Sequence, residues 1–192
     1  MDDGQLLQSA GRGDLAAFRS LFDRYAPAML RFTRRMIGDG AEVEDVVQEI
    51  MERLWTRAPL FDPARGKPRP WIYRLAGRVI ANWRAARAVR QGRGQVSLQA
   101  VGEEAVPASG VGPEEVALHL DEVARVTAGL GRLPEDCREV LVLRHLEGLG
   151  IPEMAEILDC PEGTVKSRIF YALKKLRDVL TKEKVHGTDP AM

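Results

Sequence analysis

Apolar side chains recur along this chain at spacings of three and four residues, which is the period of an amphipathic helix. The alternation that is typical of strands is confined to residues 96–101. Residues 91–113 interrupt the helical pattern with five glycines and two prolines, which indicates a flexible connection. We therefore expect an all-α protein with two small helical domains, residues 5–90 and 114–182, joined by a linker at residues 91–113.

Three helices are expected in the first domain. The first follows Asp14, which is a suitable N-cap residue. The second opens with a capping box formed by Asp39 and Glu42. The third covers residues 71–90. The segment before it, residues 61–70, contains three prolines and is expected to be a rigid loop rather than a helix.

In the second domain the periodicity predicts helices at residues 114–131, 134–147, 151–158 and 161–182. The last two form the layout of a helix-turn-helix, with a tight turn at Asp159 and Cys160. Pro161 suits the first position of the final helix, where its missing N–H lacks an intrahelical partner in any case.

The final helix is expected to have an apolar and a polar side. Its core positions are Val165, Ile169, Ala172, Leu173 and Leu176. On the opposite side are Ser167, Phe170, Tyr171 and Lys174. Hydroxyls, aromatic edges and cations on such a helix reach base edges and phosphates in a major groove. We therefore predict a DNA-binding helix, although Phe170 would also suit packing against a neighbouring helix.

Charge is segregated along a chain whose formal net charge is zero. Residues 39–62 sum to −5, residues 64–93 to +9 and residues 94–122 to −6. Residues 135–162 then sum to −6, and residues 163–186 to +5. Two basic segments that each follow an acidic one predict two modules that contact nucleic acid. Solvated helix faces would produce the same charge pattern.

Aromatic residues are interleaved with the cations of the first basic segment, as in surfaces that bind single-stranded nucleic acid. Outside the core face, one helical stripe contains Trp71, Arg74, Arg78 and Asn82. Tyr73 lies outside both the core face and this stripe, and Trp83 is assigned to the core. The basic residues of the preceding loop are candidates for holding an unstacked base.

Several classes of protein are disfavoured by what the sequence lacks. Asp2 and Asp3 stand where a signal peptide carries positive charge, and no apolar run approaches the roughly 18 residues of a membrane span. We therefore expect a soluble, cytoplasmic protein without membrane insertion. Cys137 and Cys160 form neither a disulfide framework nor a zinc signature, and are expected to be buried thiols. No metal site and no cofactor are predicted.

Five stretches of sequence resemble a known family. They are GDLAAFRSLFDRY at residues 13–25, EDVVQEIMERLW at 44–55, WIYRLAGRVIANW at 71–83, and LPEDCREVLVLRHLEGL with EGTVKSR at 133–149 and 162–168. In order and spacing they are similar to the bacterial RNA polymerase sigma factors of the extracytoplasmic-function group, the smallest sigma-70 relatives. The resemblance runs from about residue 5 to residue 180, apart from the linker.

The resemblance implies that residues 5–90 are sigma region two and residues 114–182 are sigma region four. Region two would bind the clamp helices of core RNA polymerase through Asp45, Gln48, Glu49 and Glu52. It would also melt the minus-ten element and capture a flipped non-template base. The residues implied for that element are Arg65, Lys67, Arg69, Trp71, Arg74, Arg78 and Asn82.

The resemblance further implies that region four contacts the polymerase flap and reads the minus-thirty-five element as duplex DNA. The residues implied are Thr164, Lys166, Ser167, Arg168, Phe170, Tyr171 and Lys174. A cognate anti-sigma factor is expected as a further partner. Arg78 stands where the family usually has Asn, and Tyr171 where many members have Arg, so the preferred bases do not transfer from a relative. Asp159 replaces a common turn glycine and tolerates the left-handed conformation.

Two other classes of function stay open at the level of sequence. A helix-turn-helix regulator that acts without polymerase explains residues 150–177 equally well, but it leaves the basic segment and the acidic helix at residues 44–55 without a role. A metal enzyme would use the carboxylates Glu42, Glu44, Asp45, Glu49 and Glu52. The histidines at positions 119, 145 and 186 lie far from this cluster along the chain, and no nucleophile or phosphate loop is found.

We therefore expect a dissociable promoter-specificity subunit that works by binding and performs no covalent chemistry. The free chain is expected to bind DNA poorly. Its acidic segments oppose the basic ones until polymerase holds the two modules apart.

Overall fold

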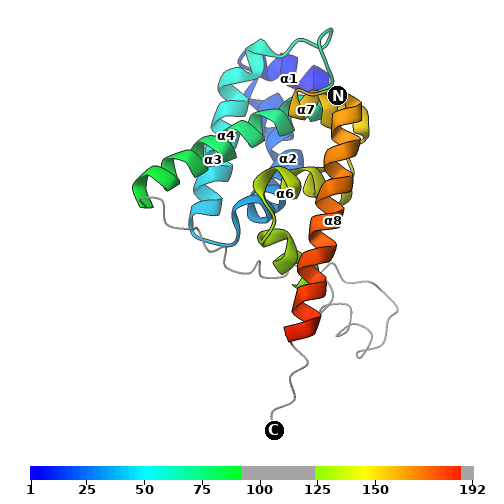
Figure 1. The fold of residues 1–192 in the computed structure, drawn as a ribbon. Coiled ribbons are helices and arrows are strands. Elements are labelled where there is room, and N and C mark those ends of the chain that lie inside the picture. The colour runs from blue at the N-terminus through cyan, green and yellow to red at the C-terminus, as the bar shows by residue number, and fades with distance from the viewer. Residues whose placement is uncertain (92–123, 187–192) are drawn as a thin grey trace, which may run out of the picture.

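The computed structural model describes residues 1–91 and 124–186, and within these ranges it contains helices and no strands. This confirms the all-α prediction. The helices form an N-terminal module and a C-terminal module that pack against each other (Figure 1). The N-terminal elements are α1 (Asp3–Gly11), α2 (Leu15–Ile37), α3 (Glu42–Arg57), the 3-10 turn η1 (Ala58–Leu60) and α4 (Pro68–Gln91).

The C-terminal module begins with a helical segment at residues 124–131. It continues with α6 (Glu135–Leu141), the π-helical turn η2 (Val142–Leu146), α7 (Ile151–Leu158) and α8 (Glu162–His186). Apart from residue 91, which ends α4, the predicted linker lies outside the described residues. The first ten residues of the predicted helix at 114–131 lie outside them as well.

Of the two helix caps predicted for the first domain, the one at Asp14 is confirmed and the one at Asp39 is wrong. The Asp14 carboxylate accepts hydrogen bonds from the backbone N–H groups of Ala16 (2.9 Å) and Ala17 (3.1 Å), as expected for the N-cap of α2. The capping box at Asp39 is wrong, because α3 begins at Glu42 and its N-cap, Ala41, has no side-chain hydrogen bond. Asp39 instead forms an ion pair with Arg34 at 3.5 Å.

Helix α1 was not predicted, because nine residues with few apolar side chains give little periodicity. Its N-terminus is a capping box between Asp2 and Gln5, and it buries Leu6, Leu7 and Ala10 against the rest of the N-terminal module.

The boundaries of two predicted helices differ from the structure. Helix α4 begins at Pro68, inside the segment predicted to be a loop, because prolines are tolerated in a first turn. Residues 134–147 are not one helix, since α6 ends at Leu141 and passes into the wider turn η2. There the N–H of Glu147 donates to the carbonyl oxygen of Val142, which accommodates one extra residue per turn.

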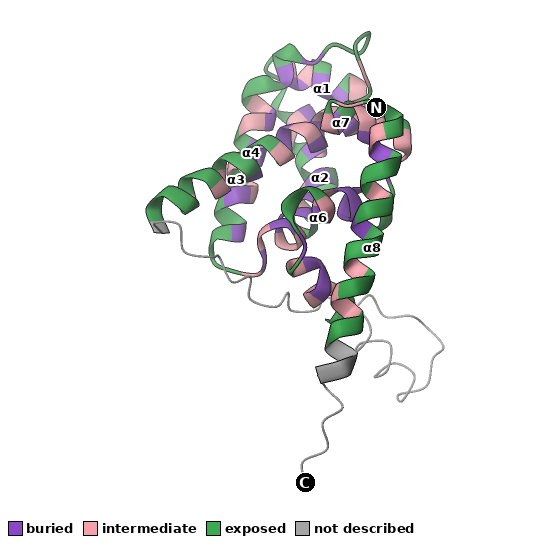
Figure 2. Cartoon of the chain, in the orientation of Figure 1, coloured by how far each residue is buried: buried purple, intermediate pink, exposed green. Residues whose placement is uncertain are grey.

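Helix α2 is the centre of the N-terminal module, and α1, α3 and α4 all pack against it. Its buried side chains recur every three or four residues and are Ala17, Leu21, Tyr25, Met29, Phe32, Thr33 and Met36. Figure 2 shows the buried positions on the faces where the helices meet. The aromatic ring of Phe32 meets that of Tyr73 on α4 edge to face, with ring centres 5.3 Å apart.

Leu173, a predicted core residue, lies at the surface, as does the large apolar side chain of Phe22 on α2. Phe22 is 45% exposed, because α3 covers only part of the apolar side of α2. Leu173 is 42% exposed, since the short helices α6 and α7 cover a narrow strip of α8. Cys137 and Cys160 are free and only half-buried, so the expectation of buried thiols is also wrong. Among the described residues, no helix is long and apolar enough to span a membrane.

Candidate nucleic-acid and partner interfaces

The turn between α7 and α8 depends on one left-handed residue. Asp159 has φ 50° and ψ 50°, as its tolerance of that conformation predicts. The chain then leaves the turn through Pro161, whose carbonyl oxygen accepts hydrogen bonds from the N–H groups of Thr164 and Val165. Pro161 therefore stands immediately before α8 rather than at its first position. This turn fixes the angle at which α8 projects from the C-terminal module.

The N-terminal half of α8 presents large aromatic side chains to solvent. Phe170 is 66% exposed and Tyr171 is 61% exposed, with ring centres 5.7 Å apart in an edge arrangement. The prediction that Phe170 faces outward is confirmed, and the alternative that it packs against a neighbouring helix is excluded. Ser167 is exposed beside them, and its hydroxyl donates to the carbonyl oxygen of Thr164 at 3.0 Å.

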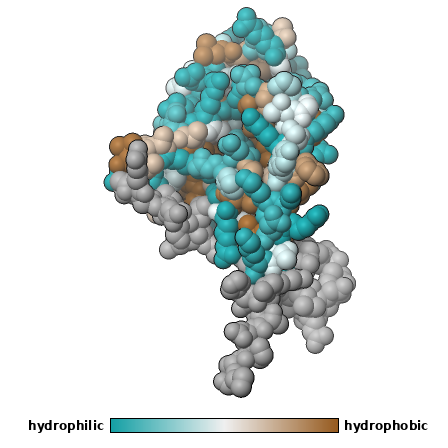
Figure 3. Space-filling model, viewed as in Figure 1, coloured by the Kyte–Doolittle hydropathy of each residue, from teal (hydrophilic) through white to brown (hydrophobic). Residues whose placement is uncertain are grey.

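The cations of α8 surround this aromatic pair. Lys166, Arg168 and Lys174 are exposed, whereas Thr164 is half-buried at the start of the helix. Most of the described surface seen in Figure 3 is hydrophilic, interrupted by small hydrophobic areas. Together these side chains combine ring faces, a hydroxyl and positive charge on one helix, a combination that suits a major groove.

The residues implied for the minus-ten element fall into two groups. Arg65, Lys67, Arg78 and Asn82 are exposed. The other three, Arg69, Trp71 and Arg74, are half-buried. Trp71 packs edge to face against Phe61 at 5.6 Å, and Arg69 lies over the ring of Tyr73 at 5.7 Å. The structure thus leaves four of the seven side chains freely accessible and partly covers the other three.

Tyr73 belongs to the core, which the helical projection missed. Its ring is buried, and its hydroxyl donates to Oε2 of Glu147 in the C-terminal module at 2.6 Å. Burial raises the pKa of the Tyr73 hydroxyl above its usual value, and the hydrogen bond to Glu147 raises it further. The hydroxyl therefore remains a donor to Glu147 at neutral pH.

The acidic face of α3 is the candidate surface for a protein partner. Asp45, Gln48 and Glu52 are exposed, and Glu49 is half-buried. Gln48 donates to Glu52 at 2.9 Å, and Glu49 forms an ion pair with Arg53 at 2.8 Å. These are contacts between neighbouring turns of one helix, which leave the carboxylates available to a cationic partner.

Beside this acidic face lies an apolar groove between α2 and α3 that sequence reasoning did not find. The groove has a volume of about 820 Å³ and is lined by Phe18, Phe22, Pro27, Leu30, Met51 and Trp55, with Glu44, Gln48 and Glu52 among its other residues. Phe18 and Trp55 meet across it edge to face at 5.0 Å. The available signal was the pair Phe18 and Phe22, which makes the apolar side of α2 wider than one core stripe.

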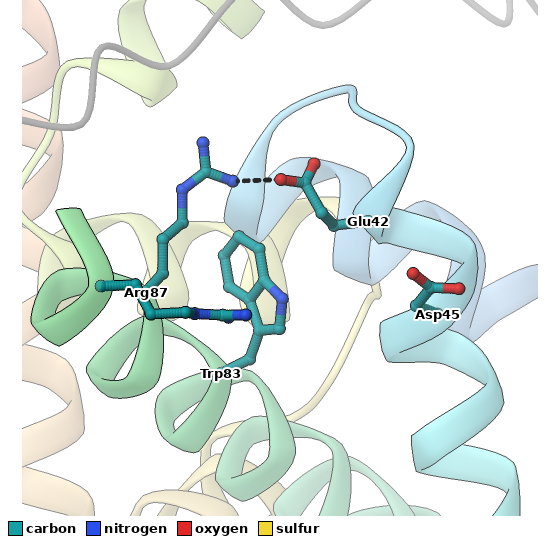
Figure 4. Close-up of a pocket in the computed structure, with 5 residues that line it drawn as sticks. Glu42, Asp45, Trp83 and Arg87 are labelled. Carbon is teal, nitrogen blue, oxygen red and sulfur yellow. Dashed lines mark hydrogen bonds and ion pairs between the residues drawn. The ribbon is translucent and has the colours of Figure 1, made fainter.

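A second, smaller pocket of about 460 Å³ lies between the start of α3 and the end of α4, and Figure 4 shows how its side chains are arranged. The Arg87 guanidinium lies over the ring of Trp83 at 5.1 Å and donates to Glu42 at 2.8 Å. Trp83 is half-buried rather than fully in the core. This contact joins α3 to α4.

A metal-based site receives no support from the geometry of the described ranges. There, no group of three or more His, Cys, Asp or Glu side chains is arranged to hold a metal ion.

Comparisons with known proteins match both modules. The family model described as Sigma-70 region 2 matches residues 21–90, and the model described as Sigma-70, region 4 matches residues 124–176. The RNA polymerase sigma-H factor of Pseudomonas aeruginosa is 33% identical over 185 residues, covering 93% of this chain and 93% of that protein. The sigma-E factor of Escherichia coli is 34% identical over 179 residues, covering 90% of this chain and 91% of that protein.

Solved structures agree with this assignment. The structure of CnrH in complex with the cytosolic domain of CnrY has a TM-score of 0.67 and 28% identity, covering 94% of this chain and 97% of that one. The Bartonella quintana sigma factor RpoE, at 21% identity and a TM-score of 0.67, shares the fold, covering 85% of this chain and 96% of that one. The chain therefore belongs to the extracytoplasmic-function sigma factors of the sigma-70 family, the transcription initiation factors that give RNA polymerase its promoter specificity.

Proposed function

We propose that this chain selects promoters by binding alone, through three surfaces of different chemistry, and that it acts in the cytoplasm without covalent catalysis. The observation that carries the proposal is the exposed aromatic pair Phe170 and Tyr171 on α8, next to Ser167. Large aromatic side chains on the second helix of a helix-turn-helix are costly to leave in water unless a partner covers them. Duplex DNA at the minus-thirty-five element is that partner.

Residues 114–182 act as region four in this proposal, and residues 5–90 act as region two. The family models support the division, since they match separate parts of the chain. In region four, Ser167, Phe170 and Tyr171 contact bases. The side chains placed near phosphates are Thr164, Lys166, Arg168 and Lys174. This module also contacts the polymerase flap.

Region two binds core polymerase through α3. Asp45, Gln48, Glu49 and Glu52 attract the cationic side chains of the clamp helices, and the adjacent groove between α2 and α3 receives apolar ones. Charge on the rim and apolar area in the centre is the arrangement expected of a specific protein interface.

The basic side of α4 and the loop before it open the minus-ten element. Arg65, Lys67, Arg78 and Asn82 are accessible in the described conformation and contact the single strand first. The partly covered side chains Arg69, Trp71 and Arg74 complete the surface. Cations that follow the backbone, with aromatic residues for stacking, match the chemistry of single-stranded DNA.

A cognate anti-sigma factor holds the chain inactive in this proposal. CnrH, which is similar over almost its whole length, was solved in complex with the cytosolic domain of CnrY. A sigma factor whose polymerase surface includes an exposed apolar groove offers such a partner a site that competes directly with polymerase.

Two double variants test the assignment of surfaces. Ser167→Ala with Tyr171→Ala is expected to weaken binding to a minus-thirty-five duplex by roughly tenfold or more while association with core polymerase is unchanged. Gln48→Lys with Glu52→Lys is expected to weaken association with core polymerase by a similar factor, because it places two positive charges on the acidic face and removes one negative charge. Asp178→Lys, a charge reversal at an exposed position of α8, is the control for core binding.

The measurements are fluorescence anisotropy on labelled duplex and on labelled core polymerase. If both double variants abolish association with core polymerase, the proposed division between α3 and α8 is wrong. If the Ser167 and Tyr171 variant retains full duplex recognition, α8 is not the reading helix.

A further inference from the structure

The first turns of α8 present a neutral strip to solvent between two cationic edges. Successive side chains of a helix are about 100° apart around its axis. Phe170, Ser167 and Tyr171 therefore lie within a sector of about 100°, and all three are exposed. Lys166 and Arg168 lie about 100° to either side of Ser167. If this strip enters a major groove, the cations face the phosphates and the neutral side chains face the bases.

Phe170 and Tyr171 form one continuous apolar surface. Their ring centres are 5.7 Å apart and their planes are inclined by 76°, an edge arrangement that aromatic rings favour. Val165 and Ala172 are buried on the opposite side of the helix and fix its rotation about its own axis. Exposed positions run along α8 in Figure 2. The ring pair is therefore held outward before any partner binds, which lowers the entropy cost of binding.

The Ser167 hydroxyl beside the rings is arranged as an acceptor. A serine hydroxyl has one proton and two acceptor lone pairs. In Ser167 the proton is donated to the carbonyl oxygen of Thr164 at 3.0 Å, so the lone pairs remain for a partner. The donors that base pairs present in a major groove are the amino groups of adenine and cytosine. Ser167 therefore suits a base pair that offers one of these amino groups.

Apolar rings beside an acceptor match some base edges better than others. Thymine presents its C5 methyl group in the major groove, whereas guanine presents the two acceptors O6 and N7. Guanine is most often read by two donors of one Arg or Lys side chain, and the neutral strip has no cation. The Tyr171 hydroxyl has a single proton to donate. Guanine against the rings would leave an acceptor without a donor, which is costly when the acceptor is buried.

We propose that Phe170 and Tyr171 form a reader of thymine C5 methyl groups, and that Tyr171 is a specificity-determining residue that selects thymine over guanine in the minus-thirty-five element. Ser167 accepts a hydrogen bond from an adenine or cytosine amino group beside that thymine. The inference rests on the proposed function, because it takes α8 as the helix that enters the major groove. It adds the chemical group on the base that the helix recognises.

The test uses the full chain in complex with core bacterial RNA polymerase. A labelled duplex library with about ten random base pairs, roughly one helical turn, is selected for binding, with core polymerase alone as the background. The enriched duplex is then synthesised again with deoxyuridine in place of one thymidine at a time. This replacement removes the C5 methyl group and keeps the base pair, so the ratio of the two affinities measures recognition of the methyl group alone.

We expect deoxyuridine to weaken binding by about fourfold at one or two positions, as the burial of a single methyl group predicts. Tyr171→Phe keeps the ring and should keep this ratio. Phe170→Ala with Tyr171→Ala should bring the ratio close to one. Lys166→Ala is the matched control on the same helix, and it should weaken binding of both duplexes equally while it lowers the dependence on salt.

Tyr171→Arg tests the selection against guanine. A guanidinium at this position can donate two hydrogen bonds to guanine O6 and N7. The selection repeated with this variant is expected to enrich guanine at a position where the unmodified chain enriches thymine. The substituted side chains are all exposed, so the helices are expected to stay intact, and circular dichroism checks that they do.

The outcomes separate the inference from the function on which it rests. An enriched duplex element whose affinity is unchanged by deoxyuridine at every thymine would overturn the inference, although α8 would remain the reading helix. Enrichment of guanine by the unmodified chain at the position that Tyr171→Arg alters would overturn it as well. No enrichment over core polymerase alone would contradict the proposed function itself, and the inference with it.

Discussion

Arg138 is a buried cation that binds four backbone carbonyl oxygens. Within the C-terminal module it donates to Leu130 at 2.9 Å, Gly131 at 2.7 Å and Leu133 at 3.1 Å, and across the interface to Met36 at 2.7 Å. Burial and the nearby Arg84 lower the pKa of Arg138 to about 10, so the guanidinium remains protonated at neutral pH. One side chain therefore fixes the turn before α6 and the end of α2 together.

Arg138→Met is expected to lower the free energy of unfolding by about 3 kcal/mol or more, because it leaves buried carbonyl groups without their donor. Urea unfolding of the full chain at pH 7 measures the change. Arg177→Met, at an exposed position of α8, should change stability by no more than about 0.5 kcal/mol. A loss below about 1 kcal/mol for Arg138→Met would show that other groups satisfy these carbonyls.

At the scale of the helix, the two aspartates near the starts of α2 and α3 have different roles. Asp14→Ala is expected to destabilise the chain by about 1 kcal/mol, because it removes the acceptor for two N–H groups of the first turn. Asp39→Ala should cost about 0.5 kcal/mol or less, since its ion pair with Arg34 is partly exposed. Equal losses, measured by thermal unfolding, would contradict the assigned caps.

The same pair shows how far the sequence predicts the elements. Periodicity locates α2, α3, α4, α7 and α8, because each has a repeating apolar side. It does not distinguish a true cap from an aspartate three residues before a glutamate, as Asp39 and Glu42 show. The apolar periodicity also continues without a break through α6 and η2. The α-helix ends there because the hydrogen-bonding pattern changes, and the composition of the sequence does not mark that change.

The sequence predicts the candidate site only where its residues lie close together along the chain. Ser167, Phe170 and Tyr171 lie within one helix, so their shared exposed side follows from spacing alone. The partner of Tyr73 is Glu147, which is 74 positions away along the chain. No periodicity links residues so far apart, so the contact between the modules emerged only from the structure.

In the proposed function, helix α4 contributes to promoter opening as a unit. Arg74→Ala with Arg78→Ala is expected to reduce opening of a minus-ten element by roughly tenfold, because each cation that contacts a phosphate adds to affinity. Permanganate reactivity of unpaired thymines in the complex with core polymerase measures the opening. Arg12→Ala with Arg19→Ala, two exposed cations elsewhere in the N-terminal module, should leave it unchanged. A similar loss in both pairs would indicate a general effect of charge.

At the scale of the whole molecule, the basic and acidic segments of the sequence form two surfaces that face each other. The basic segment at residues 64–93 contains the whole of α4, and the acidic segment at residues 135–162 supplies the side chains that meet it. A net charge of zero therefore reflects two opposed surfaces rather than an even mixture. That the free chain binds DNA poorly stays a prediction, and the docked modules give it a physical basis.

The central claim is that this chain confers promoter specificity on core RNA polymerase through two separate DNA-reading modules. The most direct test is transcription from a library of random promoter DNA by core bacterial RNA polymerase, with and without the chain, followed by sequencing of the transcribed templates. The account predicts two short enriched elements that appear only when the chain is added. If no transcripts depend on the chain, and the chain alone instead retains a duplex motif, it is a stand-alone regulator and the account is contradicted.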